Sequence, residues 1–279
     1  MLSATSVKKA FDLTGRVAII TGGAGLLGVK HGEAIAEMGG IPVLLDLNGD
    51  AAEKCAHELS LAYGGPAIGM AVDITLPEQI ATARDRIVGE FGAIHILINN
   101  ATNNPKMENR DINDFSRLEN FPLETWNQDI AVGLGGAFLC AQAFGSVMAA
   151  AGQGVILNVA SDLGLIAPDQ RLYRKDGLAD GMQPVKPVTY SVVKSGLIGL
   201  TRYLATYWAD RGVRANAIAP GGVYTGQDDA FVQRLNNLIP LGRMAGQDEY
   251  KAAVAFMVSD ASSYMTGSVL TIDGGRSCW

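Results

Sequence analysis

The chain has 279 residues, of which 48% are hydrophobic and 18% charged, so it is expected to bury a sizeable core and is not a disordered protein. Its 22 basic and 28 acidic residues give a net charge of −6, which argues against nucleic-acid binding and against binding to an anionic membrane. The three cysteines lie far apart and form no CxxC pair, which fits a reducing, cytoplasmic location and predicts neither disulfides nor a metal site.

The first expected strand, residues 17–20, runs into a glycine-rich turn and then a helix that reaches about residue 38. The turn, TGGAGLLG, places Gly22, Gly25 and Gly28 at intervals of three residues. Glycine lets the backbone turn tightly and come close to a pyrophosphate, whose charge is favoured at the N-terminus of a helix. Because the chain has 34 glycines, these residues alone are also compatible with a turn of purely structural role.

The second expected strand, residues 42–46, ends at Asp46. A carboxylate at this point is placed to accept hydrogen bonds from the ribose hydroxyls of an adenosine, and it would repel the 2′-phosphate of NADP. The next residues, Leu47, Asn48 and Gly49, carry no positive charge that would offset that repulsion. The pattern therefore favours NAD over NADP, although an acidic residue in a turn or at a helix N-terminus is the alternative.

Five more apolar runs follow, at residues 67–73, 94–100, 154–161, 213–220 and 268–273, and helical patterns separate the strands. Apolar strands that alternate with helices indicate a parallel sheet covered on both faces. No repeat, linker or low-complexity segment interrupts the pattern, and no apolar run is long enough for a membrane span. We therefore expect one Rossmann-type, doubly wound α/β domain over residues 1–279.

Two polar segments, residues 101–122 and 168–187, follow expected strands at their carboxyl ends, where open α/β sheets bind ligands. Either segment can be read as a solvated surface loop or as part of a substrate pocket and its lid. The second carries Arg171 and Arg174, whose side chains are suited to hold a phosphate or carboxylate. On this reading residues 168–187 form part of the pocket of a polar, anionic small molecule.

Tyr190 and Lys194 lie four residues apart in YSVVK, on one face of an expected helix, and Ser161 ends a strand. With TGGAGLLG, Asp73-Ile74, Asn99-Asn100-Ala101, the segment PGGVYT at 220–225 and the final IDGG, these residues resemble the short-chain dehydrogenase/reductase family in its shorter, single-domain branch. The resemblance covers about residues 13–275.

The resemblance implies a chemical role for three residues. Tyr190 would be the general acid/base, Lys194 would lower the pKa of Tyr190 and hold the nicotinamide ribose, and Ser161 would donate a hydrogen bond to the reacting oxygen. The residues that it implies for cofactor binding are Gly22, Gly25, Leu27, Gly28, Asp46, Asp73, Ile74, Asn100, Ala101, Tyr190, Lys194, Pro220, Gly221, Val223 and Thr225. It also implies a homotetramer or homodimer, in which the helical segments at 134–151 and 191–208 would pack together.

The chain departs from the family pattern in three places. Its glycine turn has the TGxxGxxG spacing of the longer branch, Gly133 stands where a fourth catalytic residue, an Asn, is usual, and the insertion at 168–187 widens the separation of Ser161 and Tyr190. In one interpretation, Gly133 leaves proton transfer to water molecules alone, which slows catalysis. In the other, it allows close helix packing together with Gly135 and Gly136. Two alternatives thus stay open: an epimerase or dehydratase with internal hydride return, and a cofactor-binding protein with impaired catalysis.

Several segments, among them APDQRLYRKDG and PVKPVTYSVVKSG, are similar to oxidoreductases of bacterial surface-sugar biosynthesis of the legionaminic-acid type. This similarity implies a sugar, sugar phosphate or nucleotide sugar as substrate. The sequence thus predicts an NAD-dependent oxidoreductase that acts on the alcohol/ketone pair of such a compound.

Overall fold

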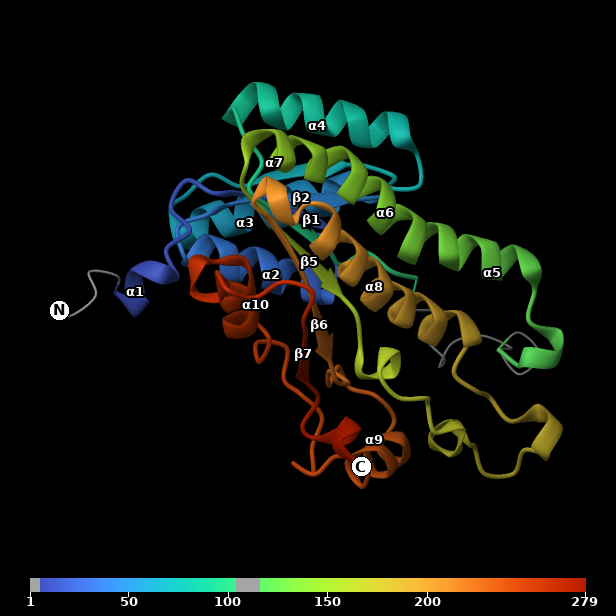
Figure 1. Cartoon of the computed structure of the whole chain (residues 1–279). Coiled ribbons are helices and arrows are strands. Elements are labelled where there is room, and N and C mark those ends of the chain that lie inside the picture. Colours follow the sequence, from blue (N-terminus) through green and yellow to red (C-terminus); the bar gives the residue numbers. More distant parts are fainter. Residues whose placement is uncertain (1–5, 104–115) are drawn as a thin grey trace.

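A computed structural model describes residues 6–103 and 116–279 and has a seven-stranded sheet at its centre (Figure 1). Every neighbouring pair of strands is parallel, and the order across the sheet is β3-β2-β1-β4-β5-β6-β7. The strands are β1 (Val17–Thr21), β2 (Ile41–Asp46), β3 (Ile68–Ala71), β4 (Ile96–Asn99), β5 (Gly154–Val159), β6 (Val213–Pro220) and β7 (Val269–Ile272). The predicted doubly wound α/β fold is confirmed, and each predicted strand is present within three residues of its predicted ends.

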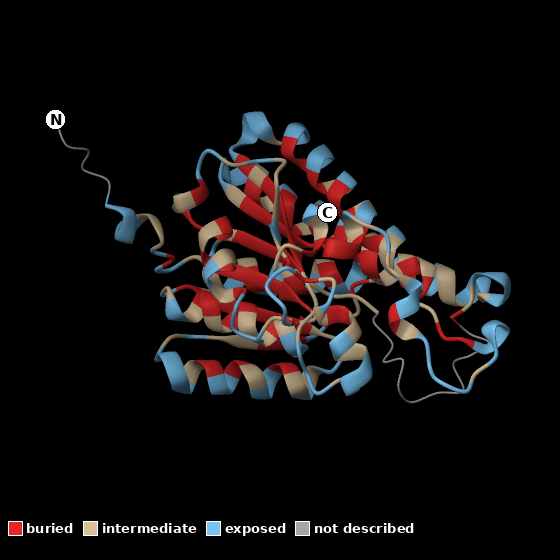
Figure 2. Ribbon diagram, turned by 90° about the horizontal axis from the view of Figure 1, so that it is seen from below, coloured by how far each residue is buried: buried red, intermediate tan, exposed pale blue. Residues whose placement is uncertain are grey.

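Helices cover both faces of this sheet. They are α1 (Val7–Ala10), α2 (Leu26–Glu37), α3 (Gly49–Tyr63), α4 (Pro77–Phe91), α5 (Leu123–Ile130), α6 (Gly136–Cys140), α7 (Ser146–Ala151), α8 (Val188–Tyr207), α9 (Asp229–Asn236) and α10 (Lys251–Val258). Helices α2, α3 and α10 contribute to the apolar core on one face, and α4, α7, α8 and the segment before α7 to the core on the other. The strands between the two layers are almost entirely buried, as Figure 2 shows.

Helices α5, α6 and α7 form one helical stretch, residues 123–151, interrupted by π-helical turns at Ala131–Gly135 and Ala141–Gly145. This stretch is long and apolar enough to cross a membrane by length and composition. Its residues Cys140, Phe144 and Met148 are, however, fully buried in the core beside the sheet. The stretch is therefore a core helix of the Rossmann-like fold.

The strand order reverses between β1 and β4, because the chain builds outward from β1 in one direction and from β4 in the other. Open α/β sheets bind their ligands at such a switch point, at the carboxyl ends of the strands. The glycine turn after β1 and the residues after β4 and β5 all lie at this edge. The fold therefore brings most of the residues that the sequence singled out to one side of the sheet.

The insertion at 168–187 contains two short 3₁₀ turns, Gln170–Tyr173 and Asp180–Met182, and extends beyond the sheet beside α9. Leu172 is buried against an apolar cluster that includes Leu235 of α9, and Arg234 of α9 donates to the backbone oxygens of Leu172 and Arg174 at 3.1 and 3.0 Å. These contacts anchor the insertion to α9. Of the other polar segment, 101–122, residues 104–115 lie outside the described part of the chain.

Candidate active site

The turn between β1 and α2 requires glycine at several positions. Gly22 has a φ of +61°, in the left-handed region that side chains disfavour. A Cβ at Gly28 would lie 2.1 Å from the backbone oxygen of Gly22, and one at Gly23 would lie 2.6 Å from the Cβ of Leu44. The backbone is therefore packed closely on itself at the N-terminus of α2. This arrangement fits a pyrophosphate, which needs close backbone approach and the positive end of a helix.

The end of β4 holds this turn in place. The side-chain amide of Asn100 donates to the backbone oxygens of Thr21 and Gly22 at 3.0 and 3.1 Å. The hydroxyl of Thr21 in turn accepts hydrogen bonds from the backbone nitrogens of Asn100 and Ala101 at 3.0 and 3.1 Å. Asn100 and Ala101 therefore fix the position of the glycine turn, which the sequence analysis did not foresee.

Asp46 lies at the end of β2 and faces the same turn. Its Oδ2 accepts from the backbone nitrogen of Ala24 at 3.1 Å, and its Oδ1 accepts from that of Asn48 at 3.0 Å. A carboxylate has room for about four hydrogen bonds, so capacity for a ligand remains. Asp46 thus combines the two interpretations of the sequence: it orders a turn, and it borders the cavity described next.

A cavity of about 1550 Å³ lies at the carboxyl edge of the sheet. It is lined by every residue that the sequence analysis assigned to catalysis or to the cofactor, except Gly28, which lies beneath the glycine turn. The lining residues from that set are Gly22, Gly25, Leu27, Asp46, Asp73, Ile74, Asn100, Ala101, Ser161, Tyr190, Lys194, Pro220, Gly221, Val223 and Thr225. The volume and the closely packed glycine turn fit a dinucleotide together with a small substrate.

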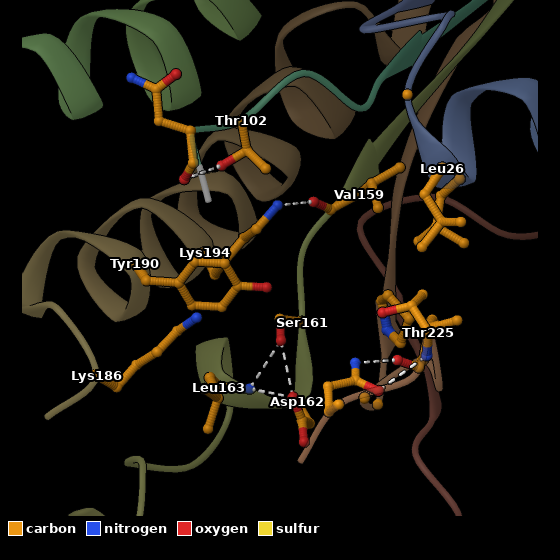
Figure 3. Close-up of a pocket in the computed structure, with 18 of the residues that line it drawn as sticks. Leu26, Thr102, Val159, Ser161, Asp162, Leu163, Lys186, Tyr190, Lys194 and Thr225 are labelled. Atoms are coloured by element: carbon orange, nitrogen blue, oxygen red, sulfur yellow. Dashed lines mark hydrogen bonds between the residues drawn. The ribbon is translucent and has the colours of Figure 1, made fainter. Parts of the chain in front are cut away.

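Ser161, Tyr190 and Lys194 meet in this cavity (Figure 3). Ser161 follows β5 and caps the 3₁₀ turn Asp162–Gly164, where its Oγ accepts from the backbone nitrogen of Leu163 at 3.2 Å. Tyr190 and Lys194 lie one turn apart in α8, and the Nζ of Lys194 donates to the backbone oxygen of Val159 at 2.8 Å. That bond fixes the ammonium group 5.7 Å from the centre of the Tyr190 ring.

Burial dominates the electrostatics of this group. It raises the pKa of Tyr190 above its ordinary value, whereas a hydrogen bond with Ser161 lowers it and the charge of Asp162 raises it further. Burial lowers the pKa of Lys194 to about 7, and the nearby charge of Lys186 adds to this effect. In the structure as it stands, Tyr190 therefore favours the protonated phenol, the form that gives a proton to a ketone.

The two arginines expected to hold an anion differ in position. Arg171 pairs with Asp169 at 2.6 Å, its side chain is 81% exposed, and it is not among the described residues that line the cavity. Arg174 does line the cavity, and it forms a longer ion pair with Asp180 at 3.3 Å. The structure therefore does not bring Arg171 to the site with Arg174.

Several charged residues that the sequence analysis gave no role of their own also line the cavity, among them Asp162, Lys186 and Arg276. Asp162 accepts from Ser161 Oγ at 2.8 Å through Oδ1 and from Arg276 Nη1 at 2.8 Å through Oδ2. The Nζ of Lys186 lies 4.0 Å from the centre of the Tyr190 ring. Lys186 could be noticed in the sequence as a basic residue of the insertion, whereas no local pattern connects Asp162 with Arg276, 114 positions away.

Gly133 lies in the π-helical turn before α6, beside α8. A Cβ there would lie 2.5 Å from Cγ1 of Val193, the residue before Lys194. Gly136 is crowded in the same way by Ile74, whose Cδ1 would lie 2.5 Å from its Cβ, whereas Gly135 is not. The structure thus gives Gly133 a packing role: it lets the helix that carries Tyr190 and Lys194 approach closely.

The sheet, the glycine turn at its switch point and the Ser161–Tyr190–Lys194 group define a nucleotide-dependent oxidoreductase as the class of protein. Residues 16–173 match the family model described as short chain dehydrogenase, and residues 178–277 match the one described as enoyl-(acyl carrier protein) reductase. The chain belongs to the short-chain dehydrogenase/reductase family, as its motifs predicted, and family membership supports the use of a nicotinamide cofactor.

Several similar proteins are named as dehydrogenases of small hydroxylated compounds. The chain is 35% identical to a D-threitol dehydrogenase of Mycolicibacterium smegmatis, with 97% of this chain and 96% of that protein covered. It is 32% identical to an NAD-dependent glycerol dehydrogenase of Listeria innocua, with 96% of each covered. A crystal structure of a gluconate 5-dehydrogenase from Burkholderia cenocepacia in complex with NADP and tartrate matches with a TM-score of 0.84 and 29% identity, covering 98% of this chain and 100% of that one.

These similarities make the chain an oxidoreductase that acts on the CH–OH group of an alcohol. They do not decide between the two cofactors, because the glycerol enzyme is named for NAD and the gluconate enzyme was solved with NADP. Nor do the names of these three relatives point to the narrower surface-sugar group, which stays a prediction.

Proposed function

We propose that the protein is an NAD-dependent dehydrogenase that interconverts an alcohol and a ketone on a polyol, sugar or sugar derivative, with Tyr190 as the general acid/base. The observation that carries this proposal is the meeting of Ser161, Tyr190 and Lys194 in one cavity with the glycine turn and Asp46. An acid, a hydrogen-bond donor and a nucleotide-binding turn around one space are the parts that hydride transfer needs.

The three residues have separate tasks in this proposal. A nicotinamide cofactor held by the glycine turn and Asp46 would supply the hydride acceptor for the alcohol carbon or the hydride donor for the ketone carbon. Tyr190 takes the hydroxyl proton during oxidation and returns it during reduction. Ser161 donates a hydrogen bond to the same oxygen and stabilises the charge that develops there. Lys194, fixed on Val159, provides a positive charge that favours the phenolate when Tyr190 acts as base.

The choice of NAD rests on Asp46. Its carboxylate lies beside the glycine turn, and Leu47 and Asn48, the next residues, are exposed and neutral. A 2′-phosphate in this place would meet a negative charge without an arginine or lysine from the following residues. Residues Asp73, Ile74, Pro220, Gly221, Val223 and Thr225 would complete the cofactor site.

Two kinds of observation support the proposed substrate class: the names of similar proteins and the charge of the cavity lining. The threitol, glycerol and gluconate enzymes are named for small hydroxylated compounds, which makes a polyol or sugar acid the broad proposal. A phosphorylated or nucleotide-linked sugar of a bacterial surface-sugar pathway is the narrower one, and it rests on the sequence resemblance alone. The position of Arg174 in the cavity lining supports an anionic compound.

We also propose a homodimer or homotetramer in the cytoplasm. Aromatic side chains on α6 and α8 remain largely exposed: Phe138 by 50%, Tyr203 by 60% and Tyr207 by 59%. A second copy of the chain that covers this helical face would remove them from water. Light scattering of the purified protein, with Tyr207→Arg for comparison, tests the assembly.

Hydride transfer is the direct test of the activity. We would supply NAD with threitol, glycerol, glucitol, gluconate and glucitol 6-phosphate and follow NADH formation. Tyr190→Phe is expected to lower kcat by about 10²- to 10⁴-fold, while the glycine turn and Asp46 still hold NADH. Tyr264→Phe, which changes a fully exposed tyrosine that does not line the cavity, is the control and should leave kcat unchanged.

A wider search uses NADH deuterated at C4 and an extract of small metabolites. A compound that gains one deuterium with the wild type, but not with Tyr190→Phe, identifies the substrate. Internal hydride return in an epimerase or dehydratase would leave NADH labelled and the products unlabelled. If no alcohol yields NADH and no metabolite gains deuterium, the proposed dehydrogenase activity is wrong.

A further inference from the structure

Asp129 of α5 is a buried carboxylate that the reaction described above does not use. Only 9% of the residue is exposed, and its two oxygens accept hydrogen bonds from different elements. Oδ2 accepts from the hydroxyl of Thr189 in α8 at 2.6 Å, and Oδ1 accepts from the side-chain amide of Asn103, after β4, at 3.1 Å. Asp129 therefore joins α5 to two segments that lie 26 and 60 positions away in the chain.

The bond to Thr189 anchors the beginning of α8. This helix starts at Val188, its N-cap is Pro187, and no side chain caps its first turn. Pro187 has no side-chain oxygen that could accept from the free N–H groups of the turn. Thr189 is 2% exposed and directly precedes Tyr190, and α5 lies beside this end of α8 (Figure 1). Asp129 thus holds, from a neighbouring helix, a turn that lacks a cap of its own.

The bond to Asn103 anchors a part of the cavity lining. Asn103 lines the cavity after β4, where the hydroxyl of Thr102 donates to its backbone oxygen at 3.4 Å (Figure 3). Tyr190 lines the same cavity. Since one carboxylate binds both Asn103 and the residue before Tyr190, it sets the position of Tyr190 relative to the segment that follows β4.

A carboxylate suits this link better than a neutral side chain. Hydrogen bonds to an ionised acceptor are about twice as strong as those between neutral groups. The negative charge also lies beside the first turn of α8, where the helix dipole favours it and where α8 has no acidic residue of its own. Gly133, four residues after Asp129, has no side chain that could bond to α8 and packs against Val193.

We propose that Asp129 is a positioning residue of the active site. Through Thr189 it holds the first turn of α8, and through Asn103 it holds that turn against the segment after β4, so that the hydroxyl of Tyr190 is aimed at the reacting oxygen. Asp129 acts through these neighbours, since it is not among the described residues that line the cavity. The inference rests on the proposed function for the role of Tyr190 as acid/base, and it adds a residue that determines kcat.

Steady-state kinetics of two variants test the link. Thr189→Val and Asp129→Leu each remove the bond between α5 and α8 at nearly constant side-chain volume. The substrate is whichever of threitol, glycerol, glucitol and gluconate the wild type oxidises fastest with NAD. We expect kcat to fall about 10- to 100-fold, since a displacement of about 1 Å can cost a factor of about 100. KM for NAD should stay the same, because the glycine turn and Asp46 are untouched.

Two further variants separate positioning from general damage to the fold. Asp129→Asn can keep both contacts, because its amide oxygen can accept from Asn103 and its amide nitrogen can donate to the hydroxyl of Thr189. It should therefore retain most of kcat. Thr201→Val is the matched control, since Thr201 is also buried in α8, where its hydroxyl accepts from Asn158 at 2.8 Å, but lies outside the described lining of the cavity. It should leave kcat unchanged.

Hydrogen exchange of backbone amides provides a measurement that needs no substrate. The amides of residues 192–194 close the first turn of α8. In Thr189→Val and Asp129→Leu they should exchange about tenfold faster than in the wild type, the effect of one lost hydrogen bond. The amides of residues 201–205, further along the same helix, should exchange at the wild-type rate.

Two kinetic results would overturn the inference: Thr189→Val and Asp129→Leu both keep the wild-type kcat, or Asp129→Asn loses as much of kcat as Asp129→Leu. If the proposed function itself fails, no alcohol yields NADH with the wild type, and hydrogen exchange then decides. Unchanged exchange at residues 192–194 in both variants contradicts the anchoring of α8 by Asp129, and faster exchange supports it.

Discussion

The guanidinium of Arg276 lies 2.8 Å from the carboxylate of Asp162, and the two side chains, 114 positions apart in the chain, are only 7% and 4% exposed. Asp162 also accepts the hydrogen bond of Ser161 Oγ, so the ion pair connects the final turn of the chain to a residue of the candidate active site. A hydroxyl has a single hydrogen to donate. Asp162 and the substrate oxygen therefore compete for the proton of Ser161, and Arg276 reduces the strength of Asp162 as acceptor.

Removing Arg276 is expected to damage both stability and catalysis. In Arg276→Met the buried carboxylate of Asp162 loses its hydrogen-bonded cation, at a cost of about 3–5 kcal/mol in the free energy of unfolding. Asp162 then also holds the Ser161 proton more tightly, so kcat should fall while NADH binding is retained. Urea unfolding and steady-state kinetics measure the two effects.

The surface pair of Arg16 and Asp260 provides the matched control. Their side chains are 30% and 61% exposed, and Arg16→Met should cost at most about 1 kcal/mol. The double variant Arg276→Met/Asp162→Asn, which also removes the buried negative charge, should be more stable than Arg276→Met alone. Equal losses in Arg276→Met and Arg16→Met would show that the buried pair contributes no more than an exposed one.

Gly133 is expected to be needed for helix packing. Gly133→Ala places a methyl group 2.5 Å from Cγ1 of Val193, where it must displace a stiff β-branched side chain. We expect a loss of about 1–3 kcal/mol in the free energy of unfolding. Adding Val193→Ala should restore most of the lost free energy of unfolding, because that substitution removes Cγ1 of Val193, the atom that the new methyl group would contact. If the single and double variants are equally unstable, the contact with Val193 is not the reason for glycine here.

The sequence predicted the sheet well, because apolar strands buried on both faces give an unambiguous pattern. It also pointed to the glycine turn and the residues around Tyr190, because the residues of each motif lie close together in the sequence and their spacing can be read directly from it. It could not predict the pair Arg276–Asp162 or the contact of Gly133 with Val193, which join elements distant in the chain. The sequence grouped Arg171 with Arg174, whereas in the structure Arg171 pairs with Asp169, two residues before it, and does not line the cavity.

The pKa of Lys194 predicts how stability depends on pH in the protein without cofactor. Its value is about 7 in the folded protein, below the ordinary 10.5, because burial disfavours the charge. Below pH 7 the lysine is protonated in both the folded and the unfolded protein. The cost of burying its charge then lowers the free energy of unfolding in full. Between pH 7 and 10.5 the unfolded state binds more protons than the folded state. The free energy of unfolding should therefore rise with pH in this range, by up to about 1.4 kcal/mol per pH unit.

Lys194→Met lacks this titration, and its stability should therefore rise less over the same range than that of the wild type. Lys186 adds a smaller rise in the free energy of unfolding above about pH 8, because burial lowers its pKa as well. Its titratable neighbours include Tyr190, Lys194 and Asp162. Urea unfolding at a series of pH values provides the comparison. Parallel curves for the wild type and Lys194→Met would mean that Lys194 keeps an ordinary pKa when the protein is folded.

The last prediction concerns the choice between NAD and NADP. Asp46→Asn removes the negative charge at the end of β2 and retains one oxygen, which can replace the acceptor of either Ala24 or Asn48 but not both acceptors. Without repulsion of a 2′-phosphate, the ratio of kcat/KM for NADP to that for NAD should rise about tenfold, the effect of roughly 1.4 kcal/mol. Asp50→Asn, an exposed aspartate in the first turn of α3, is the control and should leave the ratio unchanged. Should Asp46→Asn leave it unchanged too, the carboxylate only orders the turn, and the proposed preference for NAD loses its basis.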